Sequence, residues 1–442
     1  MFTFKDAFVK IIYVKNLKEK NDRMYSDFNI DEKLIKLASE TEIELADIFA
    51  NLDNLCLKNS SKILKAFQDA RVASSDFAEI NGYGYYDAGR DKIEQIYAQI
   101  FKAEDSLVRP QIMSGTHALS LTFFGLLKHG DTMISITGAP YDSLLTVIGI
   151  EGESRNSLLK NGINYEQIDL VNDDFDIDKI VNRLKLGNVK LVEIQRSRGY
   201  SHRKSLTIEK IERVIKAIRE VDKNVIIMVD NCYGDLVEDR EPIEVGADII
   251  VGSLMKNLGG GIAKSGGYIV GKKDLIWDIA EHFTAPGTGK DLGANFNENI
   301  NYLKGLFLAP RAVTSSLKSM IFAARIMEKL GFDVDPKYNE PRTDIIQTIN
   351  LFTPANMVNF HLGIQKGSPV DSFVIPVPAP MPGYPHEEVM AAGTFTQGST
   401  IELSCDGPMV EPYTAYMQGG LTYEYGKLGI LIALNEILKG QE

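Results

Sequence analysis

The sequence has 442 residues, of which 44% are hydrophobic and 24% charged, and its formal net charge is −12. This length predicts two or three domains, and the negative charge disfavours nucleic acid or an anionic membrane as the main partner. The three cysteines form no CxxC pair, which predicts a reducing compartment without a disulfide framework or a cysteine zinc site. Because no apolar run reaches membrane-spanning length and the first twenty residues lack a signal-peptide core, we expect a cytoplasmic protein.

Apolar residues recur at helical spacing between residues 30 and 75. We therefore expect residues 1–75 to form an N-terminal helical arm. The stretch NGYGYYDAGRD that follows, residues 81–91, has no periodicity and is crowded with glycine and tyrosine. It is predicted to be a loop with a functional role, although a structural corner rich in Gly and Tyr would look the same.

Short apolar runs alternate with helical stretches from about residue 100 onward. The runs are residues 132–138, 189–195, 224–230, 248–253 and 267–271. Runs that are continuously apolar predict strands buried on both faces, as in a largely parallel sheet covered by helices. Residues 205–221 carry an apolar stripe typical of an amphipathic helix. The pattern predicts a large α/β domain over residues 76–330.

The last part of the chain has a different pattern of predicted helices and strands. A long helix is expected from about residue 312 to 330, followed by a polar, proline-containing connector over residues 331–344. Helices and strands then mix, and a last helix is expected over residues 422–439. We predict a smaller C-terminal α+β domain over residues 331–442.

Lys256 stands between two of the predicted buried strands and is followed by three glycines, residues 259–261. Most lysines lie on the surface, but the buried flanks and the glycines favour close approach of a ligand here. A partly desolvated lysine favours its neutral amine, which attacks carbonyl carbons. Lys256 is therefore a candidate Schiff-base lysine.

Pyridoxal phosphate is an aldehyde cofactor that would need further partners. Asp230 ends a predicted strand 26 residues earlier and could face the pyridine nitrogen, although Asp after a strand is often a turn residue. Ser114, Gly115 and Thr116 open a predicted helix that could bind the phosphate or simply be capped. Ser253 is a second phosphate donor candidate. Tyr141 could stack on the ring or be a core tyrosine.

The motifs SGTHA, GAPYDS, VDNCYGD and GSLMKNLGGG, in this order, resemble the fold-type I enzymes that depend on pyridoxal phosphate, which have the aspartate aminotransferase fold. Within them, the chain is similar to the branch that contains cystathionine lyases and methionine γ-lyase. The stretches GYGYYDAGRD, IQRSRGYSHRKSLT, TAPGTGK, GTFTQGSTIELSCDGP and YMQGGLTYEYGK resemble the bacterial methionine γ-lyase-like "aluminum resistance" proteins. The resemblance covers nearly the whole chain from residue 75 onward.

The resemblance implies a role for each candidate residue. Lys256 would form the internal aldimine, Asp230 would pair with the pyridinium nitrogen and Tyr141 would stack on the ring. The phosphate would be bound by Ser114, Gly115, Thr116 and Ser253. From the neighbouring subunit, Arg90 and Tyr85 (or Tyr83 or Tyr86) would reach the same phosphate, which implies a homodimer or homotetramer with shared active sites.

The sequence departs from the family pattern at one position that matters for substrate binding. Members of the family that the chain resembles often carry Arg just after the Asp-Gly-Pro turn, whereas this chain has Val410 and Glu411. An amino-acid substrate needs a cation for its α-carboxylate. Four arginines remain as candidates, namely Arg196, Arg198, Arg203 and Arg311.

The combined interpretation is a carbon–sulfur lyase acting on a sulfur amino acid, with Lys256 as base and Tyr141 as general acid toward the leaving thiol. The choice between β- and γ-elimination stays open. Alternatives are an aminotransferase, an aldolase or a racemase on the same fold, or a cofactor-binding stress or metal-resistance protein with little lyase activity. An NAD-dependent dehydrogenase is disfavoured because GYGYYDAG does not fit GxGxxG, and six scattered histidines predict no metal site.

Overall fold

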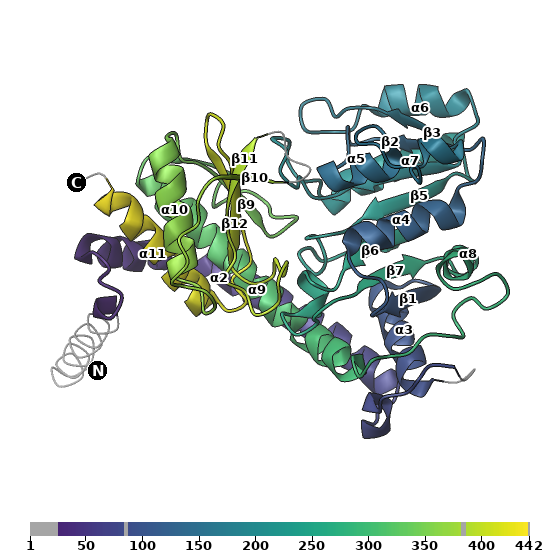
Figure 1. Ribbon diagram of the computed structural model, residues 1–442, viewed down its shortest axis with the longest axis horizontal. Helices are drawn as coiled ribbons and strands as arrows, with labels where there is room; N and C mark the ends of the chain where they lie inside the picture. Colours follow the sequence, from purple (N-terminus) through teal and green to yellow (C-terminus); the bar gives the residue numbers. More distant parts are fainter. Residues whose placement is uncertain (1–24, 84–86, 382–385, 441–442) are drawn as a thin grey trace, which may run out of the picture.

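The computed structural model describes residues 25–83, 87–381 and 386–440. In this part of the chain the strands form two sheets, each covered by helices, and two long helices run along both sheets (Figure 1). Tyr85 and Tyr86 lie outside the described residues, as does the N-terminal segment that was examined for a signal peptide. Among the described helices, none combines the length and the apolar character needed to cross a membrane.

The larger sheet has the strand order β1, β7, β6, β5, β4, β2, β3. Its strands in chain order are β1 (Asp105–Arg109), β2 (Thr132–Ser135), β3 (Asn164–Gln167), β4 (Leu191–Gln195), β5 (Ile226–Asp230), β6 (Ile249–Ser253) and β7 (Gly267–Gly271). The pairs among β3, β2, β4, β5 and β6 are parallel, and β7 is antiparallel to both of its neighbours. Each of the five predicted apolar runs contains one of these strands, so the prediction of a largely parallel sheet is confirmed.

Helices cover both faces of this sheet, which explains why its strands are continuously apolar. The helices α4 (Gly115–Leu126), α5 (Asp142–Ile148) and α8 (Lys273–Phe283) pack on the face that carries Met228. The helices α3 (Ala88–Phe101), α6 (Ile177–Lys185) and α7 (Ile208–Val221) pack on the face that carries Val229. The predicted apolar stripe of α7 is buried against the sheet.

The smaller sheet is antiparallel, with the order β10, β11, β12, β13, β9, β8. Its strands are β8 (Asp333–Asp335), β9 (Ile346–Asn350), β10 (Ala379–Pro380), β11 (Glu387–Ala391), β12 (Ser404–Pro408) and β13 (Thr414–Gln418), and α10 (Pro354–Lys366) and α11 (Tyr423–Lys439) pack on one face. Strand β8 lies inside the stretch that we expected to be a polar connector, because Val334 is buried there while its aspartate neighbours are not.

The two long helices join the two cores. In α9 (Asn299–Lys329), the first half packs in the core of the larger sheet and the second half in the core of the smaller one. This helix begins earlier than predicted, because Pro310 lies inside it instead of near its start. Helix α2 (Glu32–Asp69) runs beside α9 (Figure 1), and just before it the Asp31 amide donates to Asn435 Oδ1 in α11 (3.0 Å).

Candidate active site

The residues expected to bind a cofactor gather at the carboxyl edge of the larger sheet. Asp230 ends β5, Ser253 ends β6, and Gly115 opens the helix packed beside them. A Cβ atom added at Gly115 would lie 3.3 Å from Cys232 Sγ and 3.4 Å from Ser253 Cβ. The carboxyl ends of parallel strands are where sheets of this kind bind ligands, so the fold forms a site from segments far apart in sequence.

Lys256 lies in the connection between β6 and β7, both of which are fully buried, and it immediately precedes the short 3-10 turn Asn257–Gly259. Its Nζ lies 3.8 Å from the centroid of the Tyr233 ring. Among the described residues, no hydrogen bond or ion pair engages this ammonium group. The lysine is thus held in place by an aromatic face while its nitrogen stays available.

The charge state of Lys256 differs from the one predicted. Burial by itself lowers the pKa of Lys256, but the acidic side chains of Cys232, Tyr233 and Asp230 outweigh it and hold that pKa above its usual value. The prediction that desolvation leaves this amine neutral is therefore wrong. Lys256 is an ammonium group that must lose a proton before its nitrogen can attack a carbonyl carbon.

Asp230 is a buried carboxyl group, 3% exposed, whose Oδ1 accepts a hydrogen bond from the Cys232 amide (3.0 Å). Burial raises its pKa, and the charge of Lys256 opposes that rise without cancelling it. A second cation placed nearby would favour the ionised carboxylate further. Asp230 is therefore suited to face a protonated ring nitrogen.

The start of α4 offers backbone donors to an anion. Ser114 caps the helix, because its hydroxyl accepts a hydrogen bond from the His117 amide (3.1 Å). The amides of the first helical turn, including those of Gly115 and Thr116, have no acceptor within the helix, and the helix dipole favours negative charge there. The capping interpretation of Ser114 holds, and it is compatible with a phosphate at the neighbouring amides.

Tyr141 comes directly before α5, in the loop that follows β2. Its amide donates to Gln195 Oε1 (3.0 Å), and its hydroxyl lies 2.9 Å from Thr116 Oγ1. Burial raises the pKa of Tyr141, and Asp230 adds to the rise. The phenol therefore keeps its proton at neutral pH, which a proton donor requires.

Two residues that touch this site escaped the sequence interpretation. Tyr233 packs against Lys256 and has a backbone φ of 67°, a left-handed conformation that is unusual for tyrosine. Gln195 ends β4 and orients Tyr141. A tyrosine inside the strand-end turn VDNCYGD was the available signal for Tyr233. Nothing in the sequence distinguishes Gln195 from an ordinary strand residue.

Two of the four candidate arginines are not available to bind a substrate α-carboxylate. Arg196 is fully buried, and its guanidinium is saturated by Asn231, Gly234 and Glu238. Arg311 is exposed on α9 and pairs with Asp53. Neither is available to a substrate in this site.

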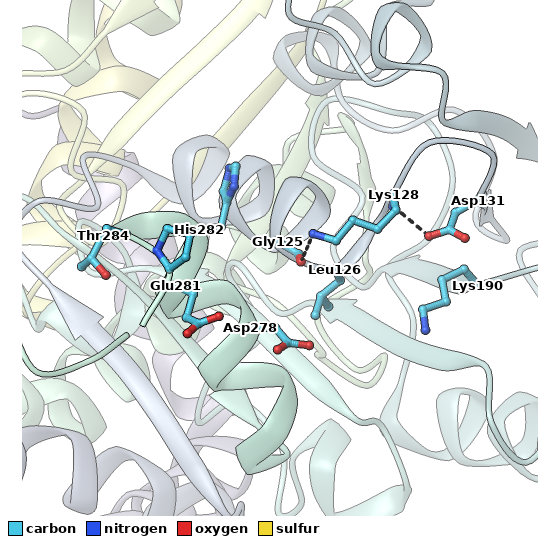
Figure 2. A pocket seen from close by; sticks show the side chains of 11 residues that line it. Gly125, Leu126, Lys128, Asp131, Lys190, Asp278, Glu281, His282 and Thr284 are labelled. Carbon is cyan, nitrogen blue, oxygen red and sulfur yellow. Dashed lines mark hydrogen bonds between the residues drawn. The ribbon is translucent and has the colours of Figure 1, made fainter. Parts of the chain in front are cut away.

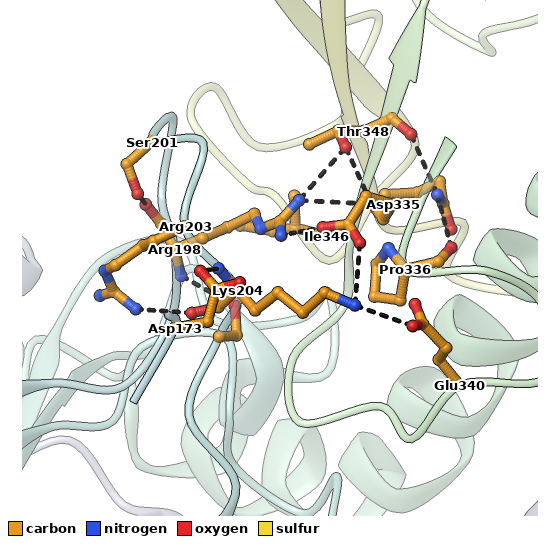
Figure 3. Close-up of polar contacts among 12 residues, drawn as sticks. Asp173, Arg198, Ser201, Arg203, Lys204, Asp335, Pro336, Glu340, Ile346 and Thr348 are labelled. Atoms are coloured by element: carbon orange, nitrogen blue, oxygen red, sulfur yellow. Dashed lines mark hydrogen bonds and ion pairs between the residues drawn. The ribbon is translucent and has the colours of Figure 1, made fainter. Parts of the chain in front are cut away.

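The other two arginines lie between the sheets (Figure 3). Arg198 forms an ion pair with Asp335 and lies 3.2 Å from Thr348 Oγ1 in β9. Arg203 donates from Nη2 to the carbonyls of Gln195 and Ser197, 2.7 Å each. Both have partners within the chain, so the geometry does not single out one of them for the α-carboxylate, and Val410 supplies no charge in their place.

The loop predicted over residues 81–91 ends earlier than expected. Asp87 caps α3 by accepting from the Arg90 amide (3.0 Å), so Arg90 lies in the first turn of a helix. Its side chain is 4% exposed, and its buried Nη1 has no hydrogen-bond partner in the described part of the chain. Contact with a neighbouring subunit's phosphate would require this side chain to turn outward.

A cavity of about 690 Å³ lies at the opposite edge of the larger sheet (Figure 2). Its lining includes Asp131 and Lys190, which precede β2 and β4 and therefore mark the amino ends of these strands. Lysine and acidic side chains mix around it, and none of the predicted cofactor residues belongs to it. Among all the described residues, including those that line this cavity, no three His, Cys, Asp or Glu side chains come together as a metal site.

Comparison with known proteins gives a consistent picture. A carbon–sulfur lyase involved in aluminum resistance from Clostridium novyi is 44% identical, with a TM-score of 0.91 over 95% of this chain and 99% of that one. A candidate cystathionine beta-lyase involved in aluminum resistance from Clostridium acetobutylicum is 46% identical, with a TM-score of 0.91 over 94% of this chain and 98% of that one.

A more distant likeness concerns the fold alone. The pyridoxal-5′-phosphate-dependent protein YhfS from Escherichia coli is 16% identical, with a TM-score of 0.60 over 88% of this chain and 97% of that one. This chain therefore shares the fold of that protein, and the mixed α/β class predicted from the sequence is confirmed. The family model described as methionine gamma-lyase matches residues 34–438, and this chain belongs to that family.

Proposed function

We propose that this protein is a carbon–sulfur lyase that uses pyridoxal phosphate to cleave a sulfur amino acid. The observation that carries the proposal is the position of Lys256. Its ammonium lies against the Tyr233 ring beside Asp230, between two buried strands, and has no hydrogen bond or ion pair among the described residues. A buried cation of this kind is costly unless it serves a ligand.

The surrounding residues fit the cofactor part by part. Asp230 would face the ring nitrogen, Tyr141 would cover the ring, and the first turn of α4 with Ser253 would bind the phosphate. Gly115 supports this assignment because its missing side chain leaves open the space between Cys232 and Ser253. When bound, pyridoxal phosphate supplies an electron sink that weakens the bonds at the α carbon of an amino acid.

The chain itself would supply the proton transfers. Lys256 Nζ would take the proton from the substrate Cα and return it at the end of the reaction. The Tyr141 hydroxyl, which burial keeps protonated, would donate a proton to the departing sulfur atom. The closed packing of Asp230 and Cys232 at the base of the site would keep water away from the ring nitrogen.

The choice of sulfur amino acid is supported by the names of related proteins. The family model is described as methionine gamma-lyase, and the two Clostridium relatives are described as a carbon–sulfur lyase and a candidate cystathionine beta-lyase. Another reaction on the same cofactor, such as amino-group transfer or aldol cleavage, is the alternative, as is a cofactor-binding metal-resistance protein with little lyase activity.

We further propose that the active enzyme contains at least two copies of the chain. Large apolar side chains stand exposed on neighbouring helices, with Leu57 and Leu64 on α2 and Ile300 and Phe307 on α9. The Phe307 ring meets Phe67 of α2 edge-on, with centroids 6.3 Å apart, so the two helices adjoin at Phe307. A second copy would cover them, and its Arg90 and Tyr85 would reach the phosphate.

The test is to incubate the purified protein with pyridoxal phosphate and L-cystathionine, then identify any keto acid. Pyruvate indicates β-cleavage and 2-oxobutyrate indicates γ-cleavage, and L-methionine in a parallel assay tests for methanethiol. The matched control is Lys256→Ala, which should lose keto-acid release and the visible absorption of bound cofactor. Release at the wild-type rate by Lys256→Ala would refute the mechanism. A yellow wild-type protein that releases no keto acid would favour the alternative reactions.

A further inference from the structure

Asn257 joins the segment that carries Lys256 to the turn that follows β5. It directly follows the lysine, and its side chain is fully buried. Its Nδ2 donates to the backbone carbonyls of Tyr233 (3.0 Å) and Asp235 (2.8 Å). Because a side-chain amide has two N–H donors, these bonds use its full donor capacity. Asn257 therefore links the position of the lysine to that of the turn.

The turn contains a residue that needs such support. Tyr233 has a backbone φ of 67°, and a non-glycine residue in this left-handed region persists only where its surroundings hold it. A hydrogen bond from the Gly234 amide to the Asn231 carbonyl (2.9 Å) closes the turn from within. Asn257 binds the Tyr233 carbonyl from outside the turn. It is therefore placed to fix the direction in which the Tyr233 ring projects.

The Tyr233 ring acts on the charge of Lys256. The lysine Nζ lies 3.8 Å from the ring centroid, and in the described part of the chain it has no hydrogen bond or ion pair. The face of an aromatic ring attracts an ammonium group and has no comparable attraction for a neutral amine. Burial lowers the pKa of Lys256, and Tyr233 is among the neighbours that raise it above its usual value. The contact between ring and lysine thus depends on the protonation of the amine.

We propose that Asn257 is a positioning residue that holds the Tyr233 ring against Lys256, so that the ring keeps the lysine protonated whenever it is not bonded to the cofactor. The proposal rests on the proposed lyase function and adds to it a residue that acts through its neighbours. Lys256 has to leave the cofactor, take a proton from the substrate and return it. An aromatic face that binds the ammonium form retains this proton inside the site. The same contact slows attack on an aldehyde, for which the amine has to be neutral.

The rate at which Lys256 bonds to added pyridoxal phosphate tests the proposal in the full-length, cofactor-free protein. Stopped-flow absorbance at neutral pH measures this rate. Tyr233→Leu removes the aromatic face and keeps an apolar side chain, so the lysine is neutral more often and the rate constant should rise about tenfold. Tyr233→Phe keeps the face and should stay within about twofold of wild type.

Asn257→Leu, which cannot donate to the turn, should raise the same rate constant by about threefold or more. Asn257→Ala is the second variant, because it removes the same donors without adding bulk. If Asn257 acts through the ring, either substitution should add nothing further in the Tyr233→Leu background. The matched control is Asn435→Leu, because Asn435 is also a buried amide donor, to the Asn29 carbonyl (3.0 Å) in the other core. It should leave the rate unchanged.

Two results would overturn the proposal. An unchanged rate in Tyr233→Leu would show that the ring does not hold the ammonium group, and full additivity of the Tyr233 and Asn257 variants would show that Asn257 acts by another route. If wild type forms no bond with pyridoxal phosphate, the lyase function fails instead. Labelling of Lys256 by acetic anhydride, which reacts only with the neutral amine, then decides the proposal by peptide mass spectrometry. Labelling about tenfold faster in Tyr233→Leu would support it, and equal labelling would overturn it.

Discussion

The hydroxyl of Tyr141 lies 2.9 Å from the hydroxyl of Thr116. This contact ties the loop after β2 to the first turn of α4, so the residue expected over the cofactor ring is positioned by the helix expected to bind the phosphate. Thr116 also lies 3.1 Å from Ser143 Oγ. The two halves of the proposed site are therefore coupled through one threonine.

Replacement of Tyr141 by Phe should separate ring packing from proton donation. The aromatic ring stays, so the Kd for pyridoxal phosphate should change little, whereas keto-acid release should fall by about 100-fold because the proton donor is gone. The measurements are a cofactor titration and kcat. Thr116→Val removes the same hydrogen bond and keeps the Tyr141 hydroxyl, so it should reduce keto-acid release much less than Tyr141→Phe does. An equal loss of kcat in both variants would show that the hydrogen bond positions the Tyr141 ring and that the hydroxyl is not the proton donor.

Gly115→Ala should weaken cofactor binding without unfolding the protein. The new Cβ would lie 3.3 Å from Cys232 Sγ, a contact that narrows the space for the phosphate. We expect the Kd for pyridoxal phosphate to rise about tenfold, with little change in Tm. Combining Gly115→Ala with Cys232→Ala removes the sulfur and should restore part of the affinity. An unchanged Kd in the single variant would argue against a phosphate at this position.

The buried Glu193 should make the protein less stable as pH rises. Among the residues that the structure describes, neither of its carboxylate oxygens has a hydrogen-bond partner, and the nearby Ser135 hydroxyl donates to the Gly138 carbonyl. Burial and Asp230 raise the pKa of Glu193 from 4.5 to about 7. The folded state therefore holds a proton that the unfolded chain releases above pH 4.5, so stability is complete below that pH and declines until about pH 7.

Glu193→Gln should remove this decline, which amounts to about 3 kcal/mol between the two ends of the range. Urea unfolding at several pH values between 4 and 8 measures it. The control is Glu166→Gln, because Arg183 lowers the pKa of Glu166, and its contribution is lost only as pH falls below the ordinary range of glutamate. A slope that is the same in wild type and Glu193→Gln would contradict the prediction.

Asp335→Asn should loosen the contact between the two sheets. Arg198 is 3% exposed and would lose its carboxylate partner, which leaves a buried guanidinium underpaired. The free energy of unfolding should fall by about 2 kcal/mol. The control is Asp333→Asn, two residues before Asp335, which removes a surface ion pair with Lys337. This variant should lower the free energy of unfolding by less than about 1 kcal/mol. Similar losses from the two variants would show that the Arg198 pair is no stronger than a surface pair.

Phe307→Glu should separate the subunits, if the exposed apolar side chains of α2 and α9 form their interface. Light scattering should give a multiple of the 49.1 kDa protomer for wild type and a smaller species for the variant. Phe373, an exposed residue in the segment between α10 and β10, serves as the control in the variant Phe373→Glu. A wild-type monomer with full activity would exclude a shared site.

The larger sheet could be predicted because its strands are buried on both faces. Strands of this kind have continuous apolar runs, which are visible in the sequence. Strand β8 and the start of α9 could not. Val334 is a single apolar residue among aspartates, and Pro310 ordinarily marks the first turn of a helix. In both places packing against the rest of the chain overrides the local pattern.

The candidate site also has features that could be predicted from the sequence and features that could not. Asp230 and Ser253 could be placed because each ends a recognisable strand, and Lys256 because it follows one; strand ends converge at one edge of a sheet. The left-handed backbone of Tyr233 and the ionised state of Lys256 could not be predicted. Both depend on which side chains the fold brings together in space, and the sequence gives only their order.

The hydrogen bond between Asp31 and Asn435 joins residues 404 positions apart. The core of the smaller sheet contains side chains from both α2 and α11, so it cannot close until the last helix has left the ribosome. At usual translation rates, α2 waits about 20 to 80 seconds for that partner. During this interval its apolar stripe is exposed, which makes the nascent chain a natural client for chaperones that bind amphipathic helices.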